Sequence, residues 1–500
     1  MSWTRWAPVA TWLCAVSLGC SSSGSDDDGA GPQGGDGGSE SAGTGGQAQP
    51  SAGKGGGGSG GTATGNPGGT SGALTWSPEV LVDEDQYPTS SPGIAMDADG
   101  NAWVAWIREG EEQEVRVRHY SASQDSWGPE QALVAPTGIL RSLAVSGTPN
   151  GDVVLAWQLE QTPATRSIQA ATYSASDEVW TDAVELALME GDWEHAVCVA
   201  TGADGGAAVG WIEQELEHVL NDSDSVTHTR TKSALQVRFA DGSGGWSDAA
   251  TAWRGEVLKP GLYTSVDTFP ASAVKLVVTG SAAAWALVGT LEGIHVASAT
   301  EGSWGDSVTL DDADTRYVQA APLANGAIQG AWVRNGDVMV SELAPGESEW
   351  SVPERIETIT RAAGSLTLAT GVDGSPTEAA LTWNTGGGID SDSRAYVTTR
   401  ADGAWAEPTQ FEGIGSGRPR VGIAGSGETI VLSGGVGFWW AQSAAGEPWS
   451  PFINYVPTEQ NVTARAIEFA VAPSRVSVAV WVDGGNDQDL YNHLLTVVAR

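Results

Sequence analysis

The chain has little cysteine, and this limits how it can be stabilised. Only three cysteines occur among its 500 residues, at Cys14, Cys20 and Cys198. A disulfide framework needs several pairs, and a structural zinc site needs clustered Cys or His ligands, so the cysteine content fits neither. Cys198 lies in the apolar run AVCVATG, where we expect a buried thiol that packs as a small hydrophobic residue.

Basic residues are also scarce. The chain has 24 Lys and Arg against 62 Asp and Glu, which gives a formal net charge of −38 at pH 7. Only five of the acidic residues precede Leu74, so the excess belongs to the rest of the chain. This charge would repel a phosphate backbone, and we therefore expect no nucleic-acid partner. Its simplest role is to keep an exported protein soluble.

Tyr and Phe are few, with 8 and 6 copies, whereas Trp occurs 23 times and Gly 67 times. Such a composition favours short strands joined by tight turns over long helices.

The N-terminal apolar run, from about Trp6 to Leu18, is too short to span a bilayer stably, but it has the length of a signal-peptide core. The sequence Ser17-Leu18-Gly19-Cys20 that ends it resembles a bacterial lipobox, although Ser17 stands where Leu is usual. The resemblance implies that residues 1–19 are a lipoprotein signal peptide and that Cys20 carries a lipid. It also implies a location in the bacterial cell envelope, at the outer membrane or cell surface, with the membrane as a partner through that anchor.

Residues 20–73 follow as a Gly- and Ser-rich segment with no aromatic residue. A segment of this kind cannot bury enough apolar area to offset the entropy of ordering it, so we expect a disordered tether with a reach on the order of 40 Å.

A tryptophan motif recurs through residues 74–500. It reads SWGPEQAL at Trp127 and EWSVPERI at Trp350. The eight copies, 44 to 66 residues apart, are centred on Trp76, Trp127, Trp180, Trp246, Trp304, Trp350, Trp405 and Trp449. This is the spacing of propeller blades, or just beyond it.

Three strand-like pieces joined by turns precede each copy except the first, which gives four antiparallel strands per unit. The chain ends with three such pieces and no tryptophan motif, whereas residues 74–81 carry a motif without the three pieces. We therefore predict an all-β propeller of eight four-stranded blades, closed by the N-terminal strand completing the last blade. Seven blades are the alternative, because the units around 283–298 and 429–442 fit least well. The turn Asp97–Asn101 is interpreted as a hairpin turn, since the carboxylates of this calcium-like segment do not recur in the other units.

The repeat style resembles bacterial surface propellers of the sialidase-like (BNR) type. The Asp box of true sialidases, Ser-x-Asp-x-Gly-x-x-Trp, is absent, which argues against glycan hydrolysis.

Function is expected in the loops that break the repeat. The longest insertions are predicted at 213–234 and 250–271, on one face of the ring. Aromatic residues that the repeat does not require could stack on sugars or anchor a protein. They are Tyr87, Trp193, Trp253, Tyr263 and Tyr455.

No catalytic constellation stands out from the repeat, and no cofactor is predicted. His119 and His295 fall on third strands and are interpreted as structural, while His218 and His228 are weak metal candidates. We therefore expect a monomeric, non-enzymatic binding or scaffolding module for a glycan or protein ligand. The alternative is a secreted glycan-active enzyme, a sialidase-like hydrolase or a lyase.

Overall fold

The structure is a computed structural model of the chain. It describes residues 20–21, 74–83, 89–110, 112–134, 136–162, 165–190, 197–220, 226–240, 245–260, 271–280, 283–357, 363–372, 374–385, 394–411, 418–435, 437–455, 464–483 and 494–500. All regular elements in these residues are β-strands. No helix in the described ranges is long and apolar enough to cross a membrane.

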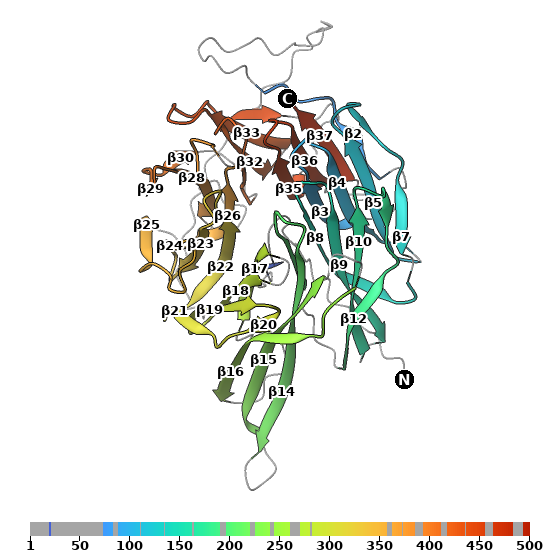
Figure 1. The fold of residues 1–500 in the computed structure, drawn as a ribbon, viewed down its shortest axis with the longest axis vertical. Coiled ribbons are helices and arrows are strands. Elements are labelled where there is room, and N and C mark those ends of the chain that lie inside the picture. Colours follow the sequence, from blue (N-terminus) through green and yellow to red (C-terminus); the bar gives the residue numbers. More distant parts are fainter. Residues whose placement is uncertain are drawn as a thin grey trace, which may run out of the picture. The chain divides into compact units, whose positions relative to one another are not determined.

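The strands form eight antiparallel sheets that follow one another around a common axis (Figure 1), so the predicted eight-bladed propeller is confirmed and the seven-bladed alternative is wrong. Blade 1 contains β3 (Thr89–Met96), β4 (Ala102–Arg108), β5 (Glu114–Ser121), β6 (Ser126–Trp127) and β7 (Gln131–Val134). Blade 2 contains β8 (Ile139–Gly147), β9 (Val153–Thr162), β10 (Thr165–Ser174), β11 (Val179–Trp180) and β12 (Val184–Glu190). Blade 3 contains β13 (Val197–Thr201), β14 (Ala207–Leu220), β15 (Val226–Ala240) and β16 (Ala250–Pro260). Blade 4 contains β17 (Ala271–Gly280), β18 (Ala283–Thr290), β19 (Gly293–Thr300), β20 (Ser303–Trp304) and β21 (Val308–Asp311), and β1 (Cys20–Ser21) pairs with β17.

The other four blades repeat this order. Blade 5 contains β22 (Thr315–Pro322), β23 (Ile328–Arg334), β24 (Asp337–Leu343) and β25 (Glu354–Glu357). Blade 6 contains β26 (Ala363–Thr370), β27 (Ala379–Thr385), β28 (Arg394–Ala401), β29 (Ala404–Trp405) and β30 (Thr409–Phe411). Blade 7 contains β31 (Arg420–Ile423), β32 (Thr429–Gly435), β33 (Gly437–Ser443) and β34 (Ile453–Tyr455). Blade 8 contains β35 (Ala464–Val471), β36 (Ser477–Asp483), β37 (Leu494–Ala499) and β2 (Val80–Leu81).

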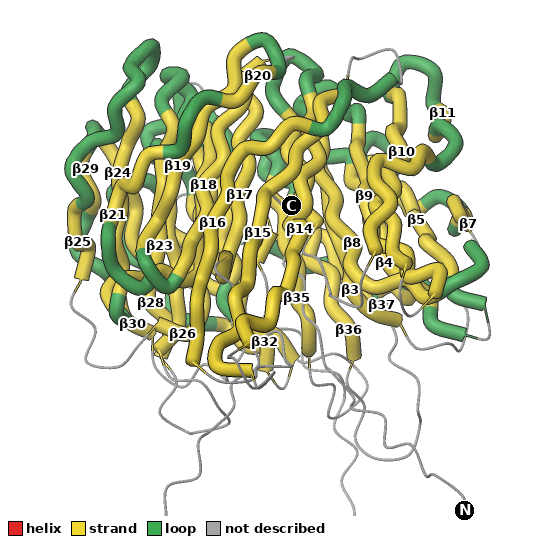
Figure 2. The backbone as a smooth tube through the Cα atoms, turned by 90° about the horizontal axis from the view of Figure 1, so that it is seen from below, coloured by secondary structure: helices red, strands yellow, loops and turns green. Residues whose placement is uncertain are grey.

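The ring closes inside blade 8, as the sequence predicts. The N-terminal strand β2 pairs with the C-terminal strand β37 through Val80 and Thr496, and a bridge joins Trp76 to Ala499. Seven of the eight motif tryptophans make this kind of pair with the third strand of their blade, for example Trp127 with Tyr120. The recurring motif therefore begins the outermost strand, and Figure 2 shows the strands standing side by side around the ring.

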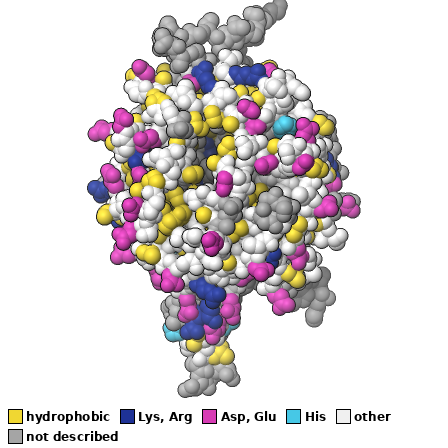
Figure 3. Space-filling model, in the orientation of Figure 1, with side chains coloured by type: hydrophobic (Ala, Val, Ile, Leu, Met, Phe, Trp, Pro, Cys, Tyr) yellow, Lys and Arg dark blue, Asp and Glu magenta, His cyan; other side chains and the backbone are white. Residues whose placement is uncertain are grey.

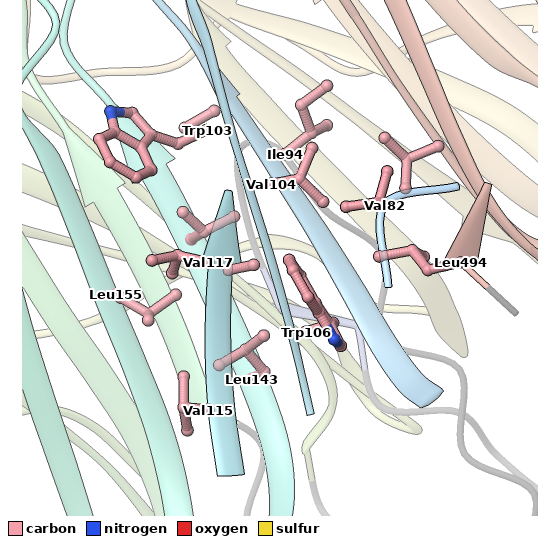
Figure 4. Packing of buried hydrophobic residues seen from close by; sticks show 14 of the residues in the cluster. Val82, Ile94, Trp103, Val104, Trp106, Val115, Val117, Leu143, Leu155 and Leu494 are labelled. Carbon is pink, nitrogen blue, oxygen red and sulfur yellow. The ribbon is translucent and has the colours of Figure 1, made fainter. Parts of the chain in front are cut away.

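Tryptophans of the second strands fill the contacts between blades. Trp106 lies in one buried cluster with Val82 and Leu494 of blade 8 (Figure 4). The whole set is fully buried and comprises Trp106, Trp157, Trp211, Trp332, Trp383 and Trp481. Truncating a buried tryptophan to alanine typically costs about 3–5 kcal/mol, so this set contributes strongly to the stability of the ring. By strand register, Val288 of blade 4 and Ser433 of blade 7 stand at the position of this second-strand tryptophan. These are the two units that fit the repeat least well.

The described parts of the insertions predicted at 213–234 and 250–271 are strands where loops were expected, and residues 221–225 and 261–270 lie outside the described residues. Residues 213–220 and 226–234 extend β14 and β15 into a hairpin, and residues 250–260 form β16, which pairs with β15. In Figure 1 this green ribbon projects beyond the other blades. The acids Glu213, Glu215 and Glu217 alternate with the period of two of a strand, so they lie on one face of β14.

Candidate functional site

A cavity of about 170 Å³ lies at the contact between blades 1 and 2. We call it the aromatic cavity. Its wall includes Trp103 and His119 from blade 1 and Tyr173 from blade 2. The hairpin turns that join the first and second strands of the two blades close it, with the Ala98 amide donating to the Pro149 carbonyl at 3.1 Å. It therefore lies on the ring face opposite to the tip of the β14–β15 hairpin, because successive strands run antiparallel.

Strand register explains why the two blades meet here through aromatic rings. Trp103 pairs with His119 across β4 and β5, so both side chains are on the same face of blade 1. Trp106 lies three residues further along and points to the opposite face, which separates the two tryptophans in Figure 4. Tyr173 pairs with Val153 and with Trp180, and its ring faces back toward blade 1.

The rings form a compact group. The centroid of Trp103 lies 4.7 Å from that of His119 and 4.6 Å from that of Tyr173. Trp180 meets Trp103 edge-on, with a centroid distance of 5.3 Å and an interplanar angle of 85°. Trp103 is only 7% exposed, so it is the floor of the cavity, while His119 and Tyr173 are partly exposed walls.

Blade 4 also carries a tryptophan at the position of Trp103, but its neighbours differ. Trp285 of blade 4 meets Trp350 of blade 5 edge-on, at 6.0 Å and 83°. At that contact, by register, Ser298 takes the place of His119, and Leu343 takes the place of Tyr173. The combination of tryptophan, histidine and tyrosine is therefore particular to the contact between blades 1 and 2.

Two carboxylates supply the negative charge of the cavity. Asp97 accepts hydrogen bonds from the Asn101 amide at 2.8 Å and from Asn101 Nδ2 at 2.7 Å, which fixes the turn. Glu178 is exposed at the turn after β10 and has a φ of 56°. None of the lining residues is Lys or Arg, so the cavity attracts cations and presents acceptors to hydroxyl groups.

The protonation states follow from burial. Burial lowers the pKa of His119, although Asp97 and Glu178 act in the opposite direction. Burial likewise raises the pKa of the Tyr173 hydroxyl, and the charges of Glu178 and Asp152 raise it further. At neutral pH the imidazole of His119 and the phenol of Tyr173 are therefore both neutral.

Of the five aromatic residues named from the sequence, the two that the structure describes, Trp253 and Tyr455, do not line this cavity. Tyr87, Trp193 and Tyr263 lie outside the described residues, and a binding role for them stays a prediction. Trp253 was expected in a loop but lies in β16, only 4% exposed, with its indole packed over Gly255 and beside His295. Tyr455 lies in β34, stacked on Phe438 at 4.8 Å, and its hydroxyl donates to the Ser77 carbonyl at 3.3 Å. Both rings are already occupied by packing.

The two histidines of the blade 3 insertion do not converge on a metal. His218 pairs with Thr229 and Val219 pairs with His228, so the imidazoles point to opposite faces of the hairpin. Across the part of the chain that the structure describes, no group of three His, Cys, Asp or Glu residues is placed to hold a metal ion. The segment 97–101 is a turn held by its own Asp97, as the hairpin interpretation predicts.

Buried charges form another group on the innermost strands. Arg420 of blade 7 pairs with Glu468 of blade 8 at 2.9 Å. Lys275 of blade 4 is 1% exposed, and its Nζ donates to Gln319 Oε1 at 3.1 Å. Burial lowers the pKa of Lys275 to about 7. Burial also raises the pKa of the Cys198 thiol to about 12, so this cysteine is an unreactive thiol, as expected from its apolar surroundings.

No family model matches the sequence, and no curated protein matches it. Similar solved structures include the polysaccharide lyase Uly1, at 10% identity over 84% of this chain and 93% of that chain, with a TM-score of 0.45. The BP39L lectin from Burkholderia pseudomallei is 12% identical over 74% of this chain and 99% of that chain, with a TM-score of 0.42. The NanB sialidase from Streptococcus pneumoniae is 10% identical over 84% of this chain and 69% of that chain, with a TM-score of 0.35.

Proposed function

We propose that this chain is a non-enzymatic glycan-binding module of the bacterial envelope. Residues 1–19 are its signal peptide, residues 20–73 its tether, and a lipid on Cys20 its anchor. The aromatic cavity is the observation that carries the proposal, because it combines ring surfaces with carboxylate and amide oxygens on a rigid support. Sugar rings bind to such sites by stacking their C–H faces on aromatic rings while their hydroxyls donate to the oxygens.

The size of the cavity suits one sugar residue. Its volume is about 170 Å³, whereas a pocket for a drug-sized ligand usually exceeds about 300 Å³. A glycan would therefore place a single sugar residue here, and the rest of the glycan would lie over the exposed turn residues Ala98, Asp99, Pro149 and Asn150.

The proposal is tested with residues 74–500, which contain every described strand of the eight sheets except β1. A glycan array identifies ligands, and isothermal titration measures their affinity. We expect saturable binding that His119→Ala weakens about ten-fold or more. The matched control is Ser298→Ala, which changes the corresponding position of blade 4 and should leave binding unchanged. Failure of the domain to bind any glycan would overturn the proposal.

One observation favours the alternative of a glycan-active enzyme. Neutral His119 and Tyr173 share the cavity, and an imidazole base opposite a phenolic acid is a usable pair for proton transfer. A broad screen with glycosidase and lyase substrates decides between the two. Turnover that His119→Ala abolishes would replace the binding function with catalysis.

A further inference from the structure

The contact between blades 8 and 1 has a place equivalent to the aromatic cavity, and a side chain of the protein occupies it. Tyr120 of blade 1 occupies the position of Tyr173, since each pairs with the motif tryptophan of its blade. Asp125 and Glu178 likewise occupy the same turn position, with φ of 50° and 56°. Into this place blade 8 extends Arg500, whose guanidinium donates to the Tyr120 hydroxyl at 2.8 Å and pairs with Asp125 at 2.8 Å.

The contact between blades 5 and 6 shows a related solution. Arg400 of blade 6 stands at the position of Tyr173, because it pairs with the motif tryptophan Trp405. Its guanidinium forms ion pairs with Glu342 of blade 5 and with Glu378. At both contacts, a cation of the chain itself meets an acid at the end of the third strands.

The aromatic cavity has the acids of this arrangement without the cation. In the described structure Tyr173 and Glu178 repeat the tyrosine and acid of blade 1. By register the residue of blade 1 that corresponds to Arg500 is Ser121, whose side chain is too short to reach them. Its hydroxyl instead lies 3.2 Å from that of Ser123.

We propose that the ligand supplies the missing cation, and that the sugar bound in the aromatic cavity is an amino sugar with a free ammonium group. This specification rests on the proposed glycan-binding function. In the cavity between blades 1 and 2, the ammonium corresponds to the guanidinium of Arg500 between blades 8 and 1. It lies near Glu178 and Asp97 and against the faces of the aromatic rings. Carboxylates and aromatic faces both favour a cation, and an acetylated or neutral sugar would leave the acids without one.

The charge of the chain acts in the same direction. With a formal net charge of −38, the protein attracts cationic polymers and repels acidic ones. Polymers with protonated hexosamine amines are cationic, so they would be drawn to the protein before local contacts form. This attraction acts over the whole protein surface, whereas contacts with the aromatic rings and with Glu178 select the cavity as the binding position.

The test is a titration at pH 7 of the full-length protein in nonionic detergent with D-glucosamine, N-acetyl-D-glucosamine and D-glucose. We expect D-glucosamine to bind about ten-fold more tightly than the other two sugars. Glu178→Gln should remove that preference while keeping the size of the side chain. Glu301→Gln is the matched control, since Glu301 lies in the corresponding turn of blade 4 with a φ of 52°, and it should retain the preference.

A second variant fills the cavity from within. Ser121→Arg places a guanidinium between blades 1 and 2, at the position that corresponds to that of Arg500 between blades 8 and 1. This variant should abolish the binding of D-glucosamine. Equal affinity for the three sugars, unchanged by Glu178→Gln, would overturn the inference and leave the glycan-binding function standing. If none of the three sugars and no array glycan binds, the proposed function fails, and the inference fails with it.

Discussion

The buried amine of Lys275 predicts an unusual dependence of stability on pH. Its pKa falls from the ordinary value of 10.5 to about 7, because burial disfavours the charged form, and the charge of Arg420 adds to this effect. Between these two pH values the unfolded chain holds a proton that the native protein lacks. The free energy of unfolding should therefore rise with pH across this window.

The magnitude follows from the shift. Each pH unit contributes about 1.4 kcal/mol, so the full window corresponds to about 5 kcal/mol and the range from pH 7 to pH 9 to about 3 kcal/mol. Lys275→Met keeps the length of the side chain and removes the charge. It leaves Gln319 without its donor, a cost of about 1 kcal/mol that does not vary with pH.

The assay is urea unfolding of both proteins at pH 6, 7, 8 and 9. The advantage of Lys275→Met should be largest at pH 6 and should shrink by about 3 kcal/mol between pH 7 and pH 9. Lys232→Met is the control, since the exposed Lys232 amine pairs with Glu217 and its pKa is raised, so it stays charged throughout. A difference between wild type and Lys275→Met that stays constant over this range would refute the reasoning.

Three further outcomes follow from the fold and the N-terminus. Glu468→Gln leaves Arg420 buried without its carboxylate and should cost about 3–5 kcal/mol in chemical unfolding, far more than loss of the exposed pair Lys232–Glu217. Gly293→Ala should lower the melting temperature by several degrees, because the glycine has a φ of 144° and a Cβ would lie 1.9 Å from the Asp311 carbonyl oxygen. Cys20→Ala should release the protein from membranes in cell fractionation, and unchanged attachment would refute the lipid anchor.

The repeat was readable from the sequence because most blades present the same residues at the same places. A motif tryptophan begins the outer strand, and a second tryptophan fills the contact with the preceding blade. The incomplete units at the two ends specify closure, since β2 and β37 can complete only one blade together.

The site was not readable in the same way. Trp103 and His119 are 16 positions apart in the chain, and only the pairing of β4 with β5 places them on one face. His119 was interpreted as structural because it lies on a third strand, yet it lines the cavity. The long insertions lie on the face that carries the blade 3 hairpin, whereas the aromatic cavity lies on the other face and is built from residues that differ between repeats. The signal for the aromatic cavity in the sequence is the difference between residues at equivalent positions of the blades, once the repeats are aligned in register.

The closure of blade 8 has a consequence for biosynthesis. Val80 can meet Thr496 only after almost the whole chain has been made, so every earlier intermediate exposes the edges of an unfinished ring. A ring of this kind benefits from chaperones that cover those edges until blade 8 is complete. It also follows that the two ends could be joined and new ends opened between other blades, giving a circularly permuted protein with the same ring.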